Sequence, residues 1–149
     1  MDRAQMKRRT KELAKVIILL CRTLPDNREG KLIGNQLFRC GTSVASNYRA
    51  ACRGRSRADF VAKLGIVEEE ADESLFWLEI IRELGILPQR EVDLIMEEVN
   101  QVLAIVVASI RTAREGKSAV KSAPQTTAGS STIRNPQSEI ESGKSLVSK

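Results

Sequence analysis

The stretch FVAKLGIVEEEADESLFWLEII, residues 60–81, decides the fold of this chain because its apolar residues recur at helical spacing. At about 100° per residue, Phe60, Leu64, Val67, Ala71 and Leu78 fall within about 60° of one another. A stripe of this kind predicts a long amphipathic helix that turns one face toward an apolar core.

The same stretch is unusually acidic, since residues 67–79 hold six carboxylates and no basic side chain. Four carboxylates of the helix share one polar side and are expected to face solvent: Glu68, Asp72, Glu79 and Glu83. Glu70 and Glu73 lie on a different side, which is largely apolar. We predict that this side forms an oligomer interface made of Ile66, Glu70, Glu73, Trp77, Ile80 and Leu84.

The residues before this helix carry the opposite charge. Residues 39–57 contain no acidic side chain and five arginines, namely Arg39, Arg49, Arg53, Arg55 and Arg57. Three interpretations are open: a charge match inside one bundle, ion pairs across an oligomer interface, and a strip of arginines that binds phosphate. A second basic group, KRRTK at residues 7–11, adds Lys7, Arg8 and Arg9 to the candidate nucleic-acid-binding residues.

Helix breakers and caps divide the rest of the chain. We expect a first domain over residues 1–115 with helices over about 4–24, 31–52, 57–84 and 88–115. Ser56 is the expected N-cap of the third helix, and Pro88 falls in the first turn of the fourth. The expected core stripe of the first helix is Leu13, Val16, Ile17 and Leu20. Four long helices with short connections and no strand signal predict an all-α fold, an antiparallel four-helix bundle.

Residues 116–149 differ in composition from the rest of the chain. They are rich in Ser, Thr, Gly and Pro, and they hold five basic and two acidic side chains. Such a segment has too few large apolar residues to offset its ordering entropy, so we predict a disordered basic tail.

The composition argues against an enzyme. The chain has no histidine, which removes the commonest general base and the usual neutral metal ligand. Cys21, Cys40 and Cys52 form no C-x-x-C pair and are expected to be reduced, buried thiols. An all-oxygen site for a hard cation is a weak alternative, built from Glu70, Glu73, Glu97 and Glu98. We therefore expect no catalytic residues, no metal and no cofactor.

The first part of the chain superficially resembles a secretion signal, because a basic segment precedes an apolar one. The apolar run at residues 16–21 is too short for that role, and no small-residue cleavage site follows it. No segment approaches the roughly 18 apolar residues of a membrane span. We expect a cytoplasmic protein that does not enter a membrane.

A series of motif residues stands in one order between residues 36 and 87. The series is Gly41, Thr42, Ser43, Val44, Asn47, Ser56, Asp59, Phe60, Lys63, Glu70, Glu73, Trp77 and Leu78. This order resembles the central motif of the four-helix-bundle proteins encoded by intervening sequences in bacterial 23S ribosomal RNA genes. Many members of that family place an acid three residues after the motif asparagine, where this chain has Ala50, so no role of that acid is carried over.

The resemblance implies an up-down four-helix bundle that assembles as a ring-like homopentamer. It also implies a fold-level relation to the accessory proteins of diversity-generating reverse transcriptases. Together with the arginines, it leads us to expect a non-enzymatic homo-oligomer that contacts RNA or another nucleic acid through phosphate-directed arginines. The alternative is a protein-interaction scaffold or accessory subunit with no direct nucleic-acid contact.

Overall fold

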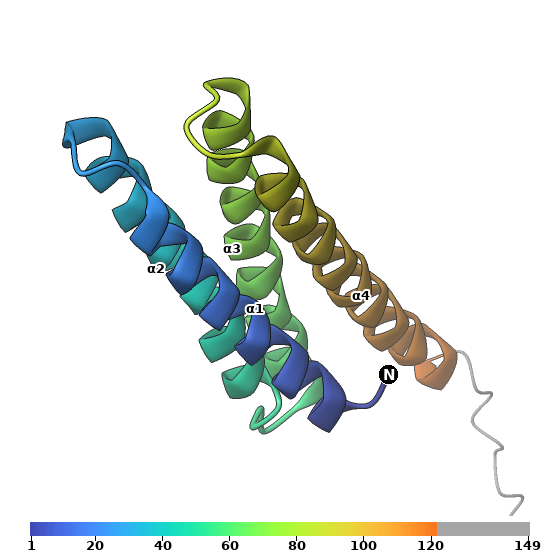
Figure 1. Cartoon of the computed structure of the whole chain (residues 1–149). Helices are drawn as coiled ribbons and strands as arrows, with labels where there is room; N and C mark the ends of the chain where they lie inside the picture. The colour runs from blue at the N-terminus through green and yellow to red at the C-terminus, as the bar shows by residue number, and fades with distance from the viewer. Residues whose placement is uncertain (122–149) are drawn as a thin grey trace, which may run out of the picture.

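The structure is a computed structural model that describes residues 1–121, and all regular structure in this part of the chain is α-helical. The four helices are α1 (Arg3–Thr23), α2 (Arg28–Ala51), α3 (Arg57–Glu83) and α4 (Gln89–Lys121). Each helix packs against the next in sequence, and α1 also meets α4 over a smaller area (Figure 1). The expected all-α fold with four helices is confirmed.

The observed helices depart from the expected bounds at two places. α2 begins at Arg28 because Asn27 is its N-cap, with the Asn27 Oδ1 accepting a hydrogen bond from the Gly30 amide at 2.8 Å. α4 continues to Lys121, so residues 116–121 belong to the helix and not to the expected tail. The next strong helix breaker along the chain is Pro124. The rest of the expected tail, residues 122–149, lies outside the described residues.

The third helix begins and ends as its sequence directs. The Ser56 hydroxyl accepts a hydrogen bond from the Asp59 amide at 3.0 Å, which confirms Ser56 as the N-cap of α3. The helix ends at Glu83 with Leu84 as its C-cap, and the next residue, Gly85, has a φ of 62°, in the left-handed region that glycine adopts without steric cost. A short connection then leads to α4.

The core is aliphatic and draws on all four helices. In α3 the predicted stripe is confirmed, with Phe60 half-buried and four residues fully buried: Leu64, Val67, Ala71 and Leu78. In α1 the prediction holds for Leu13, Ile17 and Leu20 and is wrong for Val16, which is 43% exposed. Val16 lies about 100° around the helix from Ile17 and therefore falls outside the buried face.

Gly41 allows α1 and α2 to approach closely. A Cβ atom at this position would lie 2.6 Å from the Ile17 Cδ1 and 2.8 Å from its Cγ2. Gly41 is itself buried in the middle of α2. Gly41, one of the motif residues noted in the sequence, therefore has a packing role at the α1–α2 contact.

Candidate functional site

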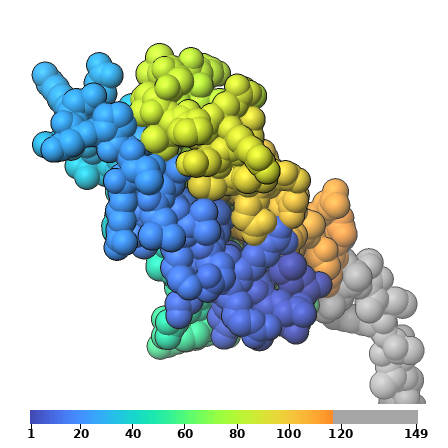
Figure 2. Space-filling model, viewed as in Figure 1, coloured from blue at the N-terminus to red at the C-terminus, as the bar shows by residue number. Residues whose placement is uncertain are grey.

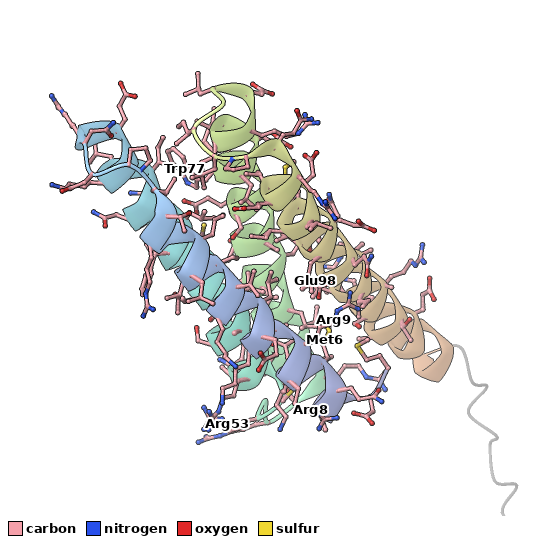
Figure 3. All side chains as sticks on the ribbon, in the orientation of Figure 1. Met6, Arg8, Arg9, Arg53, Trp77 and Glu98 are labelled. Atoms are coloured by element: carbon pink, nitrogen blue, oxygen red, sulfur yellow. The ribbon has the colours of Figure 1, made fainter. Side chains whose placement is uncertain are left out.

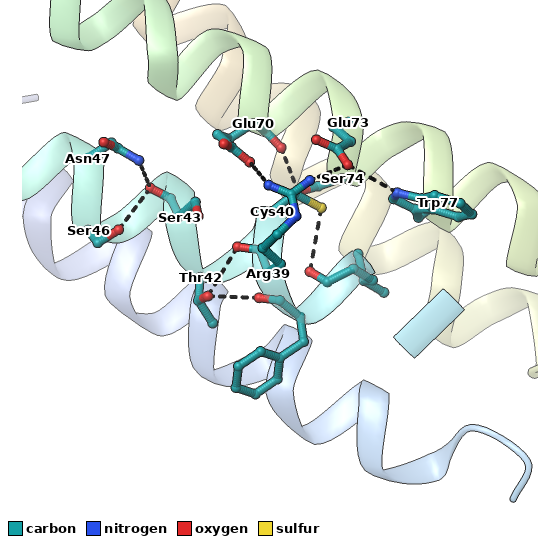
Figure 4. A network of polar contacts seen from close by, with 12 residues as sticks. Arg39, Cys40, Thr42, Ser43, Ser46, Asn47, Glu70, Glu73, Ser74 and Trp77 are labelled. Carbon is teal, nitrogen blue, oxygen red and sulfur yellow. Dashed lines mark hydrogen bonds and ion pairs between the residues drawn. The ribbon is translucent and has the colours of Figure 1, made fainter. Parts of the chain in front are cut away.

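Arg39 neutralises the two carboxylates that α3 turns toward α2. Its Nη1 lies 3.2 Å from the Glu70 Oε2, and its Nη2 donates a hydrogen bond to the Glu73 Oε1 (Figure 4). The Trp77 Nε1 donates to the same Glu73 oxygen at 3.4 Å. These bonds, from Arg39 first and Trp77 second, hold the pKa of Glu73 below its usual range. Of the three interpretations of the arginines, Arg39 therefore fits the charge match inside one bundle.

Arg9 has a similar role between α1 and α4. Its Nε and Nη2 donate to the two carboxylate oxygens of Glu98 at 2.6 and 2.9 Å, and its Nη2 also lies 2.5 Å from the Gln101 Oε1. Figure 3 shows Arg9 and Glu98 close together between these helices. The hydrogen bond with Glu98 raises the pKa of Arg9. Arg9 and Arg39 are thus occupied within the chain, which makes them poor candidates for phosphate binding.

The remaining basic candidates include one group that α1 and α2 bring together. Lys7, Arg8 and Lys11 of α1 line a groove of about 510 Å³ with Arg49 of α2. No acidic side chain lines this groove, and all four cations are exposed. We call these four residues, with Thr42 and Ser46, the α1–α2 basic groove. Clustered cations on a concave surface raise the local positive potential, which favours an anionic ligand.

The nucleic-acid-binding candidates named from the sequence did not include three residues of this groove, Lys11, Thr42 and Ser46. Lys11 follows Lys7 by four residues and so shares its helix face, a spacing that could have identified it. Thr42 and Ser46 lie at the same spacing on α2. Their hydroxyls lie close to backbone carbonyls of their own helix, at 2.7 Å from the Phe38 oxygen and 3.2 Å from the Ser43 oxygen (Figure 4). They therefore present acceptor lone pairs and small, polar walls to the groove.

The other three arginines lie elsewhere. Arg53 is exposed at the end of α2, on the same end of the molecule as Arg8 (Figure 3). Arg55 and Arg57 line a different pocket, together with Arg3 and parts of α4. The five arginines that form one basic run in the sequence are thus divided among four places in the structure.

The predicted oligomer interface on α3 is partly exposed. Ile66 and Leu84 are 43% and 66% exposed, while Trp77 and Ile80 are half-buried. Phe76, which the sequence did not single out, is 51% exposed and packs edge-on against Trp77 with ring centroids 5.0 Å apart. We call Ile66, Phe76, Trp77, Ile80 and Leu84 the Trp77 surface. Its role as an interface stays a prediction.

The cysteines are less uniformly buried than expected. Cys40 is fully buried, with its Sγ 3.2 Å from the Ser74 Oγ, whereas Cys21 and Cys52 are half-buried. All three are free thiols. Burial raises the pKa of Cys40, and burial followed by the neighbouring Cys40 raises the pKa of Cys21 to about 11. Cys21 and Cys40 are therefore protonated and weakly nucleophilic near neutral pH.

The carboxylates considered for a metal have other partners. Glu70 and Glu73 bind Arg39, and Glu98 binds Arg9. Among residues 1–121, no three His, Cys, Asp or Glu side chains gather closely enough to hold a metal ion. Within the same residues, no helix combines the length and the apolar character needed to cross a membrane.

These features define a class of protein: a four-helix all-α chain with internal arginine–glutamate bridges and a cationic groove between its first two helices. The chain belongs to the family of 23S rRNA-intervening sequence proteins, whose profile matches residues 3–108. The family resemblance seen in the sequence is thereby confirmed.

A solved structure is similar to this chain. It is the crystal structure of a protein with unknown function from the S23 ribosomal protein family of Bacteroides thetaiotaomicron VPI-5482. The two are 28% identical with a TM-score of 0.70, and the match covers 74% of this chain and 99% of the other. No protein of curated function is significantly similar to the chain.

Proposed function

We propose that this protein is a non-enzymatic, homo-oligomeric binding protein that holds the phosphate backbone of structured RNA, or of another nucleic acid, in its α1–α2 basic groove. The observation that carries the proposal is the convergence of Lys7, Arg8, Lys11 and Arg49 on one concave surface without an acidic neighbour. None of the four has an ion-pair partner among residues 1–116, in contrast to Arg9 and Arg39. Their charges are therefore available to a ligand.

The make-up of the groove favours contacts that do not depend on base sequence. No aromatic side chain lines it, so bases have no stacking platform there. Each phosphate neutralised by Lys or Arg releases condensed counterions, which makes affinity fall with salt. With four such contacts in each occupied groove, a plot of the logarithm of the association constant against the logarithm of the salt concentration should have a slope of roughly −3 to −4.

The proposal is tested by fluorescence anisotropy with labelled RNA and DNA hairpins between 50 and 200 mM salt. The groove variant carries Arg8→Gln, Lys11→Gln and Arg49→Gln. A control with the same net charge carries Arg22→Gln, Arg28→Gln and Arg90→Gln, which replace exposed arginines outside the groove. We expect the groove variant to lose binding and the control to keep most of it, with both variants unfolding at the wild-type temperature. An equal loss in both variants would show that net charge, and not the groove, determines binding.

Assembly is the second part of the proposal. The short connections and the packing of each helix on its sequence neighbour support an antiparallel, up-down order of the four helices. The Trp77 surface supports association between chains, because exposed apolar patches with an aromatic anchor are typical of interfaces. The ring-like homopentamer is the assembly that the family resemblance implies. A ring would present several basic grooves to one nucleic acid and so increase its avidity.

The Trp77 surface also favours a second candidate function, a scaffold or accessory subunit that binds another protein and no nucleic acid. The two candidates respond differently to salt. Phosphate binding weakens steeply between 50 and 200 mM, whereas an apolar protein interface keeps its affinity over this range. In either case we propose that the protein acts in the cytoplasm, without a cofactor.

A further inference from the structure

A pocket distinct from the basic groove lies near the N-terminal end of α1. Its lining comes from the start of α1, the end of α2, the connection from α2 to α3, and the C-terminal half of α4, and its volume is about 820 Å³. Figures 1 and 2 show that the start of α1 and the later part of α4 share this end of the molecule. We call it the α1–α4 pocket.

The pocket has an apolar interior. Met6, Tyr48 and Ala51 contribute to it and are almost completely buried, at 1%, 6% and 1% exposure. The half-buried side chains of Phe60 and Ile105 add to the apolar lining. Burial, with a smaller effect from Cys52, raises the pKa of Tyr48 to about 12, so its hydroxyl stays uncharged.

The sequence of α4 explains why a hollow remains here. The residues that α4 contributes beyond Ile105 are all small, namely Ala108, Ser109, Thr112 and Ala113. Such side chains cannot fill the space toward α1. The direct link between α1 and α4 through Arg9 and Glu98 lies further along α1, where the two helices are held together.

The charged lining of the pocket has one sign. Arg3, Arg55 and Arg57 line it, no acidic side chain does, and none of the three has an ion-pair partner among residues 1–116. The Arg3 guanidinium lies over the Phe60 ring, 4.6 Å from its centroid. Arg57 extends toward α4, since its Nη1 would lie 2.9 Å from a Cβ atom on Gly116. An apolar interior with cationic edges suits an apolar side chain flanked by carboxylates.

The chain itself contains such a segment. Residues 138–142 read Ser-Glu-Ile-Glu-Ser, and Glu139 and Glu141 are the only acidic residues in the stretch 116–149. In an extended peptide, neighbouring side chains point to opposite sides. If Ile140 enters the apolar interior, Glu139 and Glu141 therefore point back toward the mouth of the pocket, where the exposed side chains of the three arginines lie.

We propose that residues 138–142 of this chain bind the α1–α4 pocket, with Ile140 in the apolar interior and the carboxylates of Glu139 and Glu141 on the three arginines. The connecting chain is long enough. Ala113 lines the pocket, and α4 continues to Lys121, about 12 Å further on at 1.5 Å per residue. The roughly 18 residues from Lys121 to Glu139 span on the order of 25 Å as a random coil. Tethering at this length gives an effective concentration in the millimolar range, so a weak site is filled.

The test uses the full chain without nucleic acid, so its outcome is independent of the groove. Backbone amide NMR signals of residues 138–142 are compared with those of residues 126–132. A bound segment tumbles with the folded domain, and its signals should lose most of their intensity. Ile140→Ser, and separately Glu139→Gln with Glu141→Gln, should restore sharp signals. Leu146→Ser is the matched control, because it removes an apolar tail residue outside the segment, and it should change nothing.

A second test changes the pocket instead of the segment, by the double substitution Arg55→Gln with Arg57→Gln. This variant should also sharpen the signals of residues 138–142, whereas Arg28→Gln with Arg90→Gln should not. Sharp random-coil signals for residues 138–142 in the wild-type chain would overturn the proposal. Broad signals that persist in the Ile140→Ser variant would overturn it as well, and that variant leaves residues 1–121 unchanged.

Discussion

Arg39 of α2 donates a hydrogen bond to Glu73 of α3, on the same carboxylate oxygen that accepts from the Trp77 indole. This relationship gives part of the most acidic stretch of the chain a structural role. The carboxylates that α3 turns toward α2 are satisfied within one chain, and the conspicuous tryptophan is oriented by one of them. The basic residues without such partners can then bind a ligand, as we propose for the α1–α2 basic groove.

The Glu73 bridge predicts a dependence of stability on acid pH. Because the folded state lowers the pKa of Glu73, the bridge contributes fully above the unfolded value of about 4.3. Its contribution is lost as pH falls through the lowered pKa of the folded state. As pH is lowered from 7 to 3, the free energy of unfolding of the Glu73→Gln variant should therefore fall less than that of the wild type. Urea unfolding over this pH range measures the difference.

The size of this effect is modest because the Glu73 side chain is 35% exposed. A surface ion pair contributes about 1 kcal/mol or less. Glu79→Gln is the control, since Glu79 is exposed on the polar side of α3 and has no ion pair within residues 1–116. Equal pH profiles for the wild type and the Glu73→Gln variant would contradict the bridge.

Two helical glycines should respond in opposite directions to alanine. Gly41→Ala places a methyl group against Ile17, and such overpacking costs about 1–3 kcal/mol, more than the gain of up to about 1 kcal/mol in helix propensity. Gly65→Ala meets no atom within 4 Å and should stabilise the protein by about 0.5–1 kcal/mol. Thermal unfolding of the two variants checks the pair, and a stabilised Gly41→Ala variant would refute the close α1–α2 contact.

The Trp77 surface predicts which substitutions weaken assembly. The Leu84 side chain is 66% exposed on the isolated chain. Leu84→Ser should therefore change the free energy of unfolding of the bundle by no more than about 0.5 kcal/mol. It should nevertheless shift the oligomer toward smaller species in light scattering over a dilution series. Leu94→Ser on α4 is the control, since Leu94 is 60% exposed and lies outside this surface.

Trp77→Ala should weaken the oligomer or the bundle, because the half-buried ring contacts Phe76 and binds Glu73. An unchanged oligomer of unchanged stability would remove Trp77 from any interface. If Leu84→Ser and Leu94→Ser reduced the mass equally, the Trp77 surface would not be the specific contact.

The cysteines should react slowly in the folded protein. With its pKa raised to about 11, Cys21 has roughly two orders of magnitude less thiolate at pH 8 than an ordinary cysteine. Cys40 is protected by full burial as well. Iodoacetamide labelling followed by peptide mass spectrometry should show Cys21 and Cys40 reacting far more slowly in buffer than in urea. Equal rates in both conditions would contradict the buried environment.

The sequence predicted the helices well because their signals are local. The stripe from Leu64 to Leu78 and the Ser56 cap can be read within one helix. Val16 was assigned to the core because the wheel of one helix does not show where the neighbouring helices lie. The end of α4 was placed too early because the change in composition at Gly116 precedes the first strong helix breaker.

The candidate site was harder to predict because it depends on register between helices. Arg9 and Glu98 are 89 residues apart, so no local pattern reveals that one neutralises the other. The same limit applies to Lys11 and Arg49, which share a groove only once α1 lies on α2. A charge match between the arginines and the carboxylates of α3 was one of three open interpretations, and only the structure shows that Arg39 binds Glu70 and Glu73 within one chain.

The most direct test of the central claim is native mass spectrometry of the protein purified without nuclease and eluted at near-physiological salt. We predict a homo-oligomeric mass with copurifying RNA or DNA for the wild type. The Arg8→Gln, Lys11→Gln, Arg49→Gln variant should give the same oligomer without nucleic acid. A wild-type oligomer free of nucleic acid would contradict the proposed binding function and favour the protein scaffold, and a monomer would contradict the assigned Trp77 surface.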